Sequence, residues 1–260
     1  MVTYPHRMPA PDRTVSRVPS WLKAVLAVAA IAVIAVSIWR PWATPAATVA
    51  AGSDDVAAAV EIAPLDLPDS PRVLIFGDSW TYGSAAASPR LGYAYIVSEA
   101  AGWVTIVDGV RGSGYLKPGI DGPDFGTRMA ELDPTLAPDL IIVQGSINDR
   151  RLPASGYKDA VTAAWDTLAA TYPNARIVIL GPAPQVLPVE RATSRIDSDL
   201  AELASDRGWF YISPLGEGWI TEANYLDVID TSETGADHPS SAGHRYLAQR
   251  LAEAVAELSE

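Results

Sequence analysis

The sequence predicts an α/β protein, a three-layer α/β/α sandwich built around a parallel sheet of five strands. From residue 71 onward, short runs that are apolar on both faces recur along the chain, as in strands that helices cover on both sides. The longer segments between them place apolar residues three and four positions apart, which is typical of amphipathic helices. Because strands and helices that alternate in this way are joined by right-handed crossovers, the strands line up in one parallel sheet.

The expected elements follow one another in chain order. The five strands are residues 72–76, 104–107, 140–143, 176–180 and 209–212. The clearest helices are residues 91–101, 125–132, 158–171, 189–207 and 242–258. If the strand order is 2-1-3-4-5, as in flavodoxin-like sheets, the first and third strands are neighbours. The loops that follow them then flank the crevice in which such sheets bind ligands.

An apolar stretch precedes this domain and is long enough to cross a membrane. Residues 21–39 would form about 28 Å of helix at about 1.5 Å per residue, close to a bilayer core of roughly 30 Å. The segment before it is basic, with Arg7, Arg13, Arg17 and Lys23 against one acid, Asp12. The positive-inside rule therefore predicts a cytoplasmic tail over residues 1–20 and a transmembrane anchor over residues 21–42.

A cleaved signal segment is the alternative to a retained anchor, and it would make the protein secreted. The anchor is favoured because the apolar region of a signal peptide is shorter, about 7 to 15 residues, and is closely followed by small residues. Here the bulky sequence Trp39-Arg40-Pro41-Trp42 follows instead. We expect a linker over residues 43–70 and one domain over residues 71–260, at the cell membrane and outside the cytoplasm.

Composition excludes several classes of function. The chain has no cysteine, so it can form no disulfide, thiolate metal site or cysteine nucleophile. Beyond residue 46 it carries 14 Lys and Arg against 30 Asp and Glu, a net charge of −16, which argues against nucleic acid as a partner. Because the few histidines and scattered acids show no metal-ligand spacing, we expect neither a metal nor another cofactor.

Four polar segments stand out at the ends of the expected strands and near the C-terminus. Gly77-Asp78-Ser79 ends the first strand, a Gly-rich turn over residues 109–114 follows the second, and a turn containing Asn148-Asp149 follows the third. The fourth segment is residues 237–244, with His238-Pro239 at its start and Gly243-His244 at its end. A serine hydroxyl needs a base to become a nucleophile. Of the three histidines, His6 lies in the predicted cytoplasmic tail, so His238 and His244 remain as candidates.

In this order the four segments resemble the SGNH (GDSL-type) hydrolase family, over roughly residues 71–258. The resemblance implies the SGNH hydrolase fold and a serine esterase that cleaves O-acyl or O-acetyl esters through an acyl-serine intermediate. It implies that Ser79 is the nucleophile and His238 the base. His244, at the start of a helix, is expected to have a structural role.

The resemblance also implies donors for the oxyanion that develops during ester cleavage. They are the backbone N–H groups of Ser79 and Gly112 and the side-chain amide of Asn148. A residue without Cβ, such as Gly112, lets backbone and substrate approach closely. Gly109 and Gly114 remain alternatives for that position, and an Asx turn with Asp149 is the alternative for Asn148.

The chain departs from the family pattern at the third catalytic position. The family has an acid three residues before the histidine, where this chain has Gly235. We assign the acid to Asp237, next to His238, to orient the imidazole and stabilise its charged form. Glu233 or Asp230 from a shifted loop are alternatives, as is a backbone carbonyl that leaves a Ser–His dyad.

Four other side chains near these motifs have competing interpretations. Asp78 is expected to brace the turn by accepting backbone N–H bonds. Trp80 and Tyr115 line an acyl or sugar pocket or, alternatively, pack in the core. Arg150 meets an anionic group of the substrate or is a solvated surface arginine.

The sequence thus predicts an esterase acting on a small-molecule or glycan acyl ester, on glycans or lipids of the cell envelope. An O-acyltransferase would use the same residues. A non-catalytic carbohydrate-binding module is the rival from another class, since the usual acid is missing. A carboxylate within reach of the His238 Nδ1 favours the enzyme, whereas Ser79 and His238 held far apart favour the module.

Overall fold

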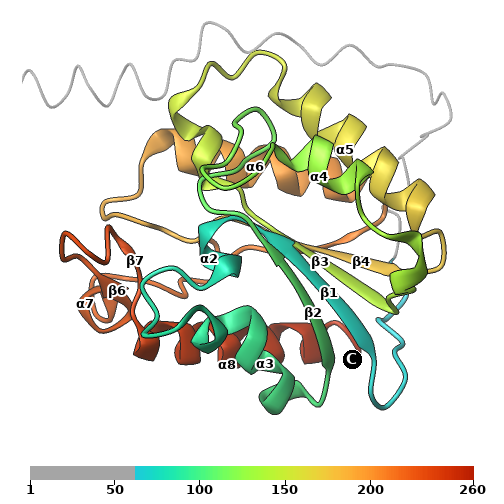
Figure 1. Ribbon diagram of the computed structural model, residues 1–260, viewed down its shortest axis with the longest axis horizontal. Coiled ribbons are helices and arrows are strands. Elements are labelled where there is room, and N and C mark those ends of the chain that lie inside the picture. Colours follow the sequence, from blue (N-terminus) through green and yellow to red (C-terminus); the bar gives the residue numbers. More distant parts are fainter. Residues whose placement is uncertain (1–61) are drawn as a thin grey trace, which may run out of the picture. The chain divides into compact units, whose positions relative to one another are not determined.

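The computed structural model describes residues 62–260, and its centre is a parallel sheet of five strands (Figure 1). The strands are β1 (Arg72–Gly77), β2 (Val104–Gly109), β3 (Leu140–Gln144), β4 (Arg176–Leu180) and β5 (Phe210–Ile212). They pair in the order β2-β1-β3-β4-β5, and all four pairings are parallel. The predicted five-stranded parallel sheet is therefore confirmed, with β1 and β3 as neighbours.

Helices cover both faces of the sheet. Three lie on one side in Figure 1, namely α4 (Phe125–Ala130), α5 (Tyr157–Thr171) and α6 (Arg191–Asp206), whereas α3 (Tyr93–Ala101) and α8 (Ser241–Glu257) lie on the other. The remaining helical pieces are short and lie in connections: α2 (Ser79–Tyr82), α7 (Tyr225–Val228), η1 (Pro89–Leu91), η2 (Pro134–Leu136) and η3 (Ile147–Arg151). The three layers agree with the sequence prediction.

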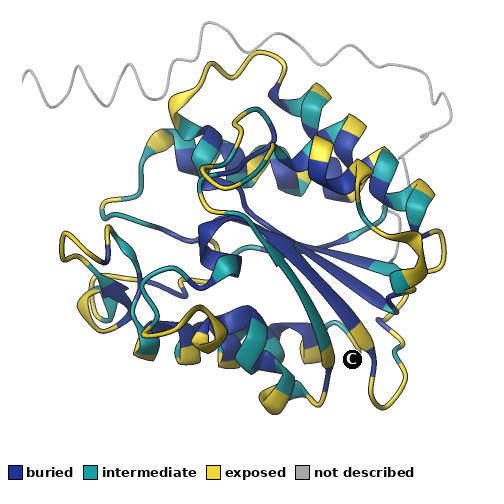
Figure 2. Cartoon of the chain, viewed as in Figure 1, coloured by how far each residue is buried: buried dark blue, intermediate teal, exposed yellow. Residues whose placement is uncertain are grey.

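Two apolar clusters, one on each face, bury the central strands β1, β3 and β4, whereas the edge strand β2 is only partly buried (Figure 2). Because side chains alternate along a strand, Val73 and Ile75 of β1 join the cluster formed with α3 and α8. Leu74 and Phe76 face the other way, into the cluster with α4, α5 and α6. Each such side chain contributes about 1.5–3 kcal/mol on burial. This packing fixes the register and brings the carboxyl ends of all strands to one edge.

A second, much smaller sheet lies near the C-terminus. Its strands β6 (Ile229–Asp230) and β7 (His238–Pro239) pair antiparallel, with Asp230 opposite His238. The loop between them returns through Ala236 and Asp237, which both have positive φ, +47° and +58°. Strands of two residues leave no alternation in the sequence, so this hairpin was not predicted.

The N-terminal boundary of the domain differs from the prediction. Leu65 is buried in the core, and its N–H donates to the Leu258 carbonyl. The folded part therefore includes residues assigned to the linker and does not begin at residue 71. The predicted anchor over residues 21–42 lies outside the described residues. Within residues 62–260, no helix is both long and apolar enough to span a membrane.

His244 ties three segments together, as the structural role predicted for it requires. It is fully buried in α8, its Nδ1 accepts the Tyr93 N–H at 3.1 Å, and its Nε2–H donates to the Ser84 carbonyl at 3.0 Å. Burial lowers the pKa of His244 to about 4. The folded state therefore favours the neutral imidazole.

We predict that His244 contributes to acid sensitivity. Because the pKa of His244 falls from 6.5 to about 4 on folding, its contribution to the free energy of unfolding is fully present above pH 6.5. Lowering the pH from 6.5 to 4 should remove up to about 3 kcal/mol of the free energy of unfolding. Urea unfolding of wild type and His244→Gln at pH 7 and pH 4.5 measures this. The variant should have a lower free energy of unfolding than wild type at pH 7, but this free energy should fall by less between pH 7 and pH 4.5. An equal fall in both proteins would contradict the prediction.

Candidate active site

Ser79 lies in the tight turn that follows β1. Asp78 caps α2, and its Oδ1 accepts the Trp80 N–H at 2.9 Å, which is the bracing role expected for it. Gly77 has no room for a side chain, because a Cβ would collide with Thr81. Ser79 is the first residue of α2 and is 7 % exposed. The turn thus holds its hydroxyl at the carboxyl edge of the sheet.

His238 reaches this hydroxyl from the far end of the chain. Its Nε2 lies 2.9 Å from the Ser79 Oγ, and its Nδ1 lies 3.0 Å from the Gly235 carbonyl oxygen. Because a carbonyl only accepts, the proton of the neutral imidazole belongs on Nδ1, which leaves the Nε2 lone pair facing Ser79. This is the geometry that a serine nucleophile and its general base require.

The structure does not give Asp237 the position assigned to it. The partner of the His238 Nδ1 is the Gly235 carbonyl, and within residues 62–260 the Asp237 carboxylate makes no hydrogen bond to the imidazole. Asp237 lies in the left-handed turn, where its N–H donates to the Asp230 carbonyl. The prediction for Asp237 is corrected in favour of the backbone-carbonyl alternative. The acceptor still comes from three residues before the histidine, but from the main chain.

Gly235 is required by its surroundings. A Cβ at this position would collide with the side chain and backbone of Asp230, which lies across the hairpin. Its carbonyl also accepts the backbone N–H of His238 at 3.1 Å. Glycine replaces the family's acid at this position because the turn is too tightly packed for a side chain. The Gly235 carbonyl oxygen instead accepts hydrogen bonds from both the backbone N–H and the ring of His238.

Asp78 places a buried carboxylate close to this pair. Burial raises the pKa of Asp78 to about 6, whereas the Trp80 N–H bond and the charge of His238 lower it. The Asp78 Oδ2 also lies 3.4 Å from the Asn148 amide nitrogen. When ionised, Asp78 stabilises a positive charge on His238 through space, without touching the ring.

The loops after β2 and β3 are clamped together by Asp149. This carboxylate is buried and accepts the N–H groups of Tyr115 at 2.7 Å and Leu116 at 3.0 Å. Burial raises the pKa of Asp149, and these backbone donors oppose the rise. A second link runs from the Ser146 hydroxyl to the Ser113 carbonyl at 2.8 Å. The two loops therefore form one rigid wall beside Ser79.

The structure distinguishes the three glycines of the Gly-rich turn. Gly112 has a φ of +74°. Together with Ser79 it lines a cleft at the carboxyl edge of the sheet. Gly109 instead packs against the backbone of Tyr82, and Gly114 packs against the Asp149 carboxylate, both too closely for a Cβ. The geometry thus places Gly112, rather than the two alternatives, next to the serine.

Asn148 also lines this cleft. Its amide nitrogen donates to the Ser113 carbonyl at 3.0 Å and lies 3.4 Å from Asp78. Its side-chain oxygen accepts no backbone N–H within residues 62–260, so the Asx-turn alternative is not met. The structure brings the amide of Asn148 to the same wall as Gly112.

Two of the competing interpretations are decided by packing. Trp80 and Tyr115 are buried in the core clusters, and the Tyr115 hydroxyl accepts the Trp165 Nε1–H at 2.8 Å, so neither lines the cleft. Arg150 does line it but is only 11 % exposed. Its guanidinium is bound to Glu190 at 2.6 Å and Gln185 at 2.8 Å, so it is not a solvated surface arginine.

Arg128 is a supporting residue that the sequence did not reveal. It is buried in α4, and one guanidinium nitrogen donates to the Gly77 carbonyl at 3.0 Å and the Ser113 Oγ at 2.9 Å. The other donates to the carbonyl and carboxylate of Asp108, at 2.8 and 2.6 Å. The group also lies 4.1 Å from the centre of the Phe76 ring. A single arginine in an apolar helix is the only sequence signal of this role.

These residues surround a cleft of about 810 Å³ at the carboxyl edge of the sheet. It contains Ser79, Gly112, Asn148 and His238, a volume and composition suited to a small organic ligand. Within residues 62–260, no group of three or more His, Asp or Glu is arranged to hold a metal ion. The chemistry available in the cleft is that of an activated serine beside fixed hydrogen-bond donors.

A family model and a curated protein that match this sequence are both of the GDSL type. The model of the GDSL-like Lipase/Acylhydrolase family matches residues 75–246. The GDSL lipase Rv0518 of Mycobacterium tuberculosis is 27% identical over 193 residues, which are 69% of this chain and 79% of that protein.

Two solved structures show the same fold. The aryl esterase of M. smegmatis aligns with a TM-score of 0.55 and 20% identity, over 73% of this chain and 100% of that chain. A family two carbohydrate esterase from Clostridium thermocellum, in complex with cellohexaose, aligns with a TM-score of 0.53 and 16% identity, over 74% of this chain and 66% of that chain.

We predict that Arg128→Met destabilises the domain by about 3–5 kcal/mol, because it leaves the Asp108 carboxylate and two buried acceptors without their partner. Arg128→Lys keeps the charge but loses the forked geometry, so it should cost less. Urea unfolding measures both. In a double-mutant cycle, Asp108→Asn should remove part of the cost of Arg128→Met. If Arg128→Met lowered the free energy of unfolding by less than about 1 kcal/mol, the supporting role of Arg128 would be contradicted.

We predict that Asp237→Asn leaves the reactivity of Ser79 nearly unchanged. Its carboxylate does not hold the imidazole, whereas loss of a true triad acid costs about 10⁴-fold. The rate of Ser79 labelling by a fluorophosphonate probe should stay within about threefold of wild type. His238→Ala is the control that abolishes labelling. A loss of several hundredfold in Asp237→Asn would restore Asp237 as the acid.

Proposed function

This chain belongs to the GDSL-like Lipase/Acylhydrolase family and is a hydrolase that acts on ester bonds, and we propose that it is a serine esterase of carboxylic esters working through Ser79 and His238. The observation that carries the proposal is the 2.9 Å contact between the Ser79 Oγ and the His238 Nε2. The imidazole is held for this task by the Gly235 carbonyl.

In the proposed mechanism, His238 first takes the proton of the Ser79 hydroxyl as the oxygen attacks the carbonyl carbon of the ester. The tetrahedral intermediate collapses, the C–O bond to the alcohol breaks, and His238 returns the proton to the departing alcohol. Water then attacks the acyl-serine while His238 accepts its proton. The second intermediate collapses to free acid, and the proton returns to Ser79.

The negative oxygen of both intermediates needs donors that are already in place. We assign this role to the backbone N–H groups of Ser79 and Gly112 and to the Asn148 amide, which must exchange one of its present acceptors, the Ser113 carbonyl or Asp78, for the oxyanion. All three residues line the cleft beside the reacting hydroxyl. The clamp formed by Asp149 supports the assignment, because it fixes the loops of Gly112 and Asn148 relative to each other.

A Ser–His dyad supported by a carbonyl stabilises the imidazolium less than a triad does, because a carbonyl dipole replaces a full charge. The nearby carboxylate of Asp78 offsets part of this difference when it is ionised. Two observations separate the enzyme from the rival hypothesis, a non-catalytic binding module, and they point in different directions. The His238 Nδ1 lies against the Gly235 carbonyl and not against the carboxylate that favours the enzyme. Ser79 and His238, however, are not held far apart, and their 2.9 Å contact argues against the module.

The substrate that fits this proposal is an acyl ester of a glycan or lipid of the cell envelope. The support for the location is the apolar stretch over residues 21–39 with its basic flank, which would tether the domain outside the cytoplasm. The support for the substrate class is a cleft of about 810 Å³, large enough for a sugar or glycerol unit with its acyl group. The C. thermocellum relative is itself a carbohydrate esterase.

The test is hydrolysis of 4-nitrophenyl acetate by the full chain, with mass spectrometry of the acyl-enzyme. An acetyl group should be trapped on the peptide that contains Ser79. Ser79→Ala and His238→Ala should each lower kcat by about 10³–10⁴-fold, because each removes a partner of the proton transfer. Hydrolysis that survives Ser79→Ala would refute the mechanism.

A further inference from the structure

The walls of the cleft are basic although the domain is acidic. Residues 62–260 contain 14 Lys and Arg against 27 Asp and Glu, a formal net charge of −13. The side chains that line the cleft show the opposite balance, with four cations, Arg111, Lys117, Arg150 and Arg151, against two acids, Glu190 and Asp237. Charges act over about 8 Å at physiological ionic strength, so the acids behind this lining, Asp78, Asp121 and Asp149, also act on a ligand in the cleft. What favours an anion is therefore decided by which lining cations remain without an acidic partner.

Two of the four cations are neutralised by partners. Arg111 binds Asp121 through two hydrogen bonds, of 2.6 and 2.9 Å. Arg150 binds Glu190 at 2.6 Å. The Arg150–Glu190 pair joins two lining residues of the cleft, and the Arg111–Asp121 pair closes the loop between its own two residues, so both guanidinium groups have a structural use.

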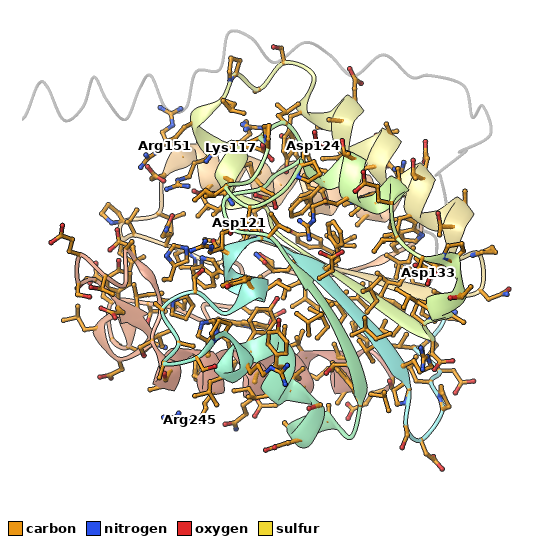
Figure 3. The ribbon with its side chains drawn as sticks, viewed as in Figure 1. Lys117, Asp121, Asp124, Asp133, Arg151 and Arg245 are labelled. Atoms are coloured by element: carbon orange, nitrogen blue, oxygen red, sulfur yellow. The ribbon has the colours of Figure 1, made fainter. Side chains whose placement is uncertain are left out.

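Lys117 and Arg151 differ from them, because neither makes an ion pair with any residue of the described domain. Both side chains are exposed, and Figure 3 labels them at the same edge of the domain. The charge of Lys117 is attracted through space by Asp149. This carboxylate, however, is buried and occupied by backbone N–H groups. The two cations are therefore available to a ligand.

The backbone under both cations is well held. The Lys117 carbonyl accepts the Gly114 N–H at 2.8 Å, and Arg151 is the last residue of η3, which also carries Asn148. The two side chains thus project from the same pair of loops as Gly112 and Asn148. Ile120, 78 % exposed, lines the cleft next to Gly112 and adds apolar surface beside the charges.

We propose that the ester substrate carries a negatively charged group, a carboxylate or phosphate, which Lys117 and Arg151 bind at the mouth of the cleft. The inference rests on the proposed serine esterase function. The cations act in selection of the substrate, because they bind a group away from the ester carbonyl. A neutral ester of the same size lacks this interaction and is turned over less efficiently at low concentration.

The experiment compares matched esters with and without the charge, using the full chain. On the acyl side, mono-4-nitrophenyl adipate, whose carboxylate is too far along the chain for efficient attack on its own ester, is paired with 4-nitrophenyl heptanoate. On the alcohol side, 4-acetoxybenzoate is paired with its methyl ester, and 4-acetoxybenzyl phosphate with 4-acetoxybenzyl methyl ether. Each kcat/KM is divided by the rate constant for spontaneous hydrolysis. The three pairs separate carboxylate from phosphate and show on which side of the ester the charge lies.

We expect wild type to prefer the anionic member of at least one pair by about tenfold at low salt, and the preference to fall as salt screens the charges. In the double variant Lys117→Gln/Arg151→Gln the ratio should fall to about one, and Lys117→Glu should bring it below one. Arg245→Gln is the matched control, since Arg245 is an exposed arginine that does not line the cleft and is labelled at the opposite end of Figure 3. It should keep the wild-type ratio.

The possible failures point to different causes. Equal corrected rates within every pair, with neutral esters still hydrolysed, would overturn the inference and leave the esterase proposal standing. A preference that survives in the double variant would also overturn it, because other groups would then bind the charge. Hydrolysis of none of the six esters would overturn the proposed function and this inference with it.

Discussion

The parallel pairing of β1 with both β2 and β3 is the constraint on which the site depends. In this register Gly77 lies opposite Gly109, and Phe76 lies opposite Val143. The three strands therefore end at one level, and the chain turns there into three polar loops. Apolar packing on both faces fixes the register, since a shift by one residue would turn every buried side chain to the wrong face. The core thus sets the position of the catalytic loops.

Three buried polar side chains then join these loops: Asp78, Arg128 and Asp149. Each is costly to bury, and hydrogen bonds offset that cost. Arg128 and Asp149 bond backbone groups of other segments, whereas Asp78 bonds the Trp80 N–H of its own turn and faces the Asn148 amide of the loop after β3. Because these partners come from different strands, the groups make the loops mutually rigid. This arrangement preorganises the loops that carry the backbone N–H groups of Ser79 and Gly112, whereas the Asn148 amide has to exchange an acceptor to bind a developing oxyanion.

His238 reaches the site through a different kind of support. It stands on a hairpin of two-residue strands outside the main sheet, and its ring is held by a main-chain carbonyl. Orientation of the imidazole needs only an acceptor at Nδ1, which a carbonyl supplies as well as a carboxylate. Stabilisation of its charge needs an anion, and here Asp78 contributes through space. The two tasks of a triad acid are thus separated in this chain.

The sequence by itself determined the sheet and the helices, because apolar periodicity is local, and it placed Ser79 at a strand end. The pairing of Ser79 with His238 was implied by the resemblance to the SGNH family. It also indicated Gly112 and Asn148 at the same edge. Only the tertiary structure decided that the Nδ1 partner is the Gly235 carbonyl, since Asp230 and a left-handed turn fill the space of a side chain there. It likewise decided the role of Arg128 and which cleft cations are paired. Those outcomes depend on contacts between residues far apart in the chain, and no local pattern encodes such contacts.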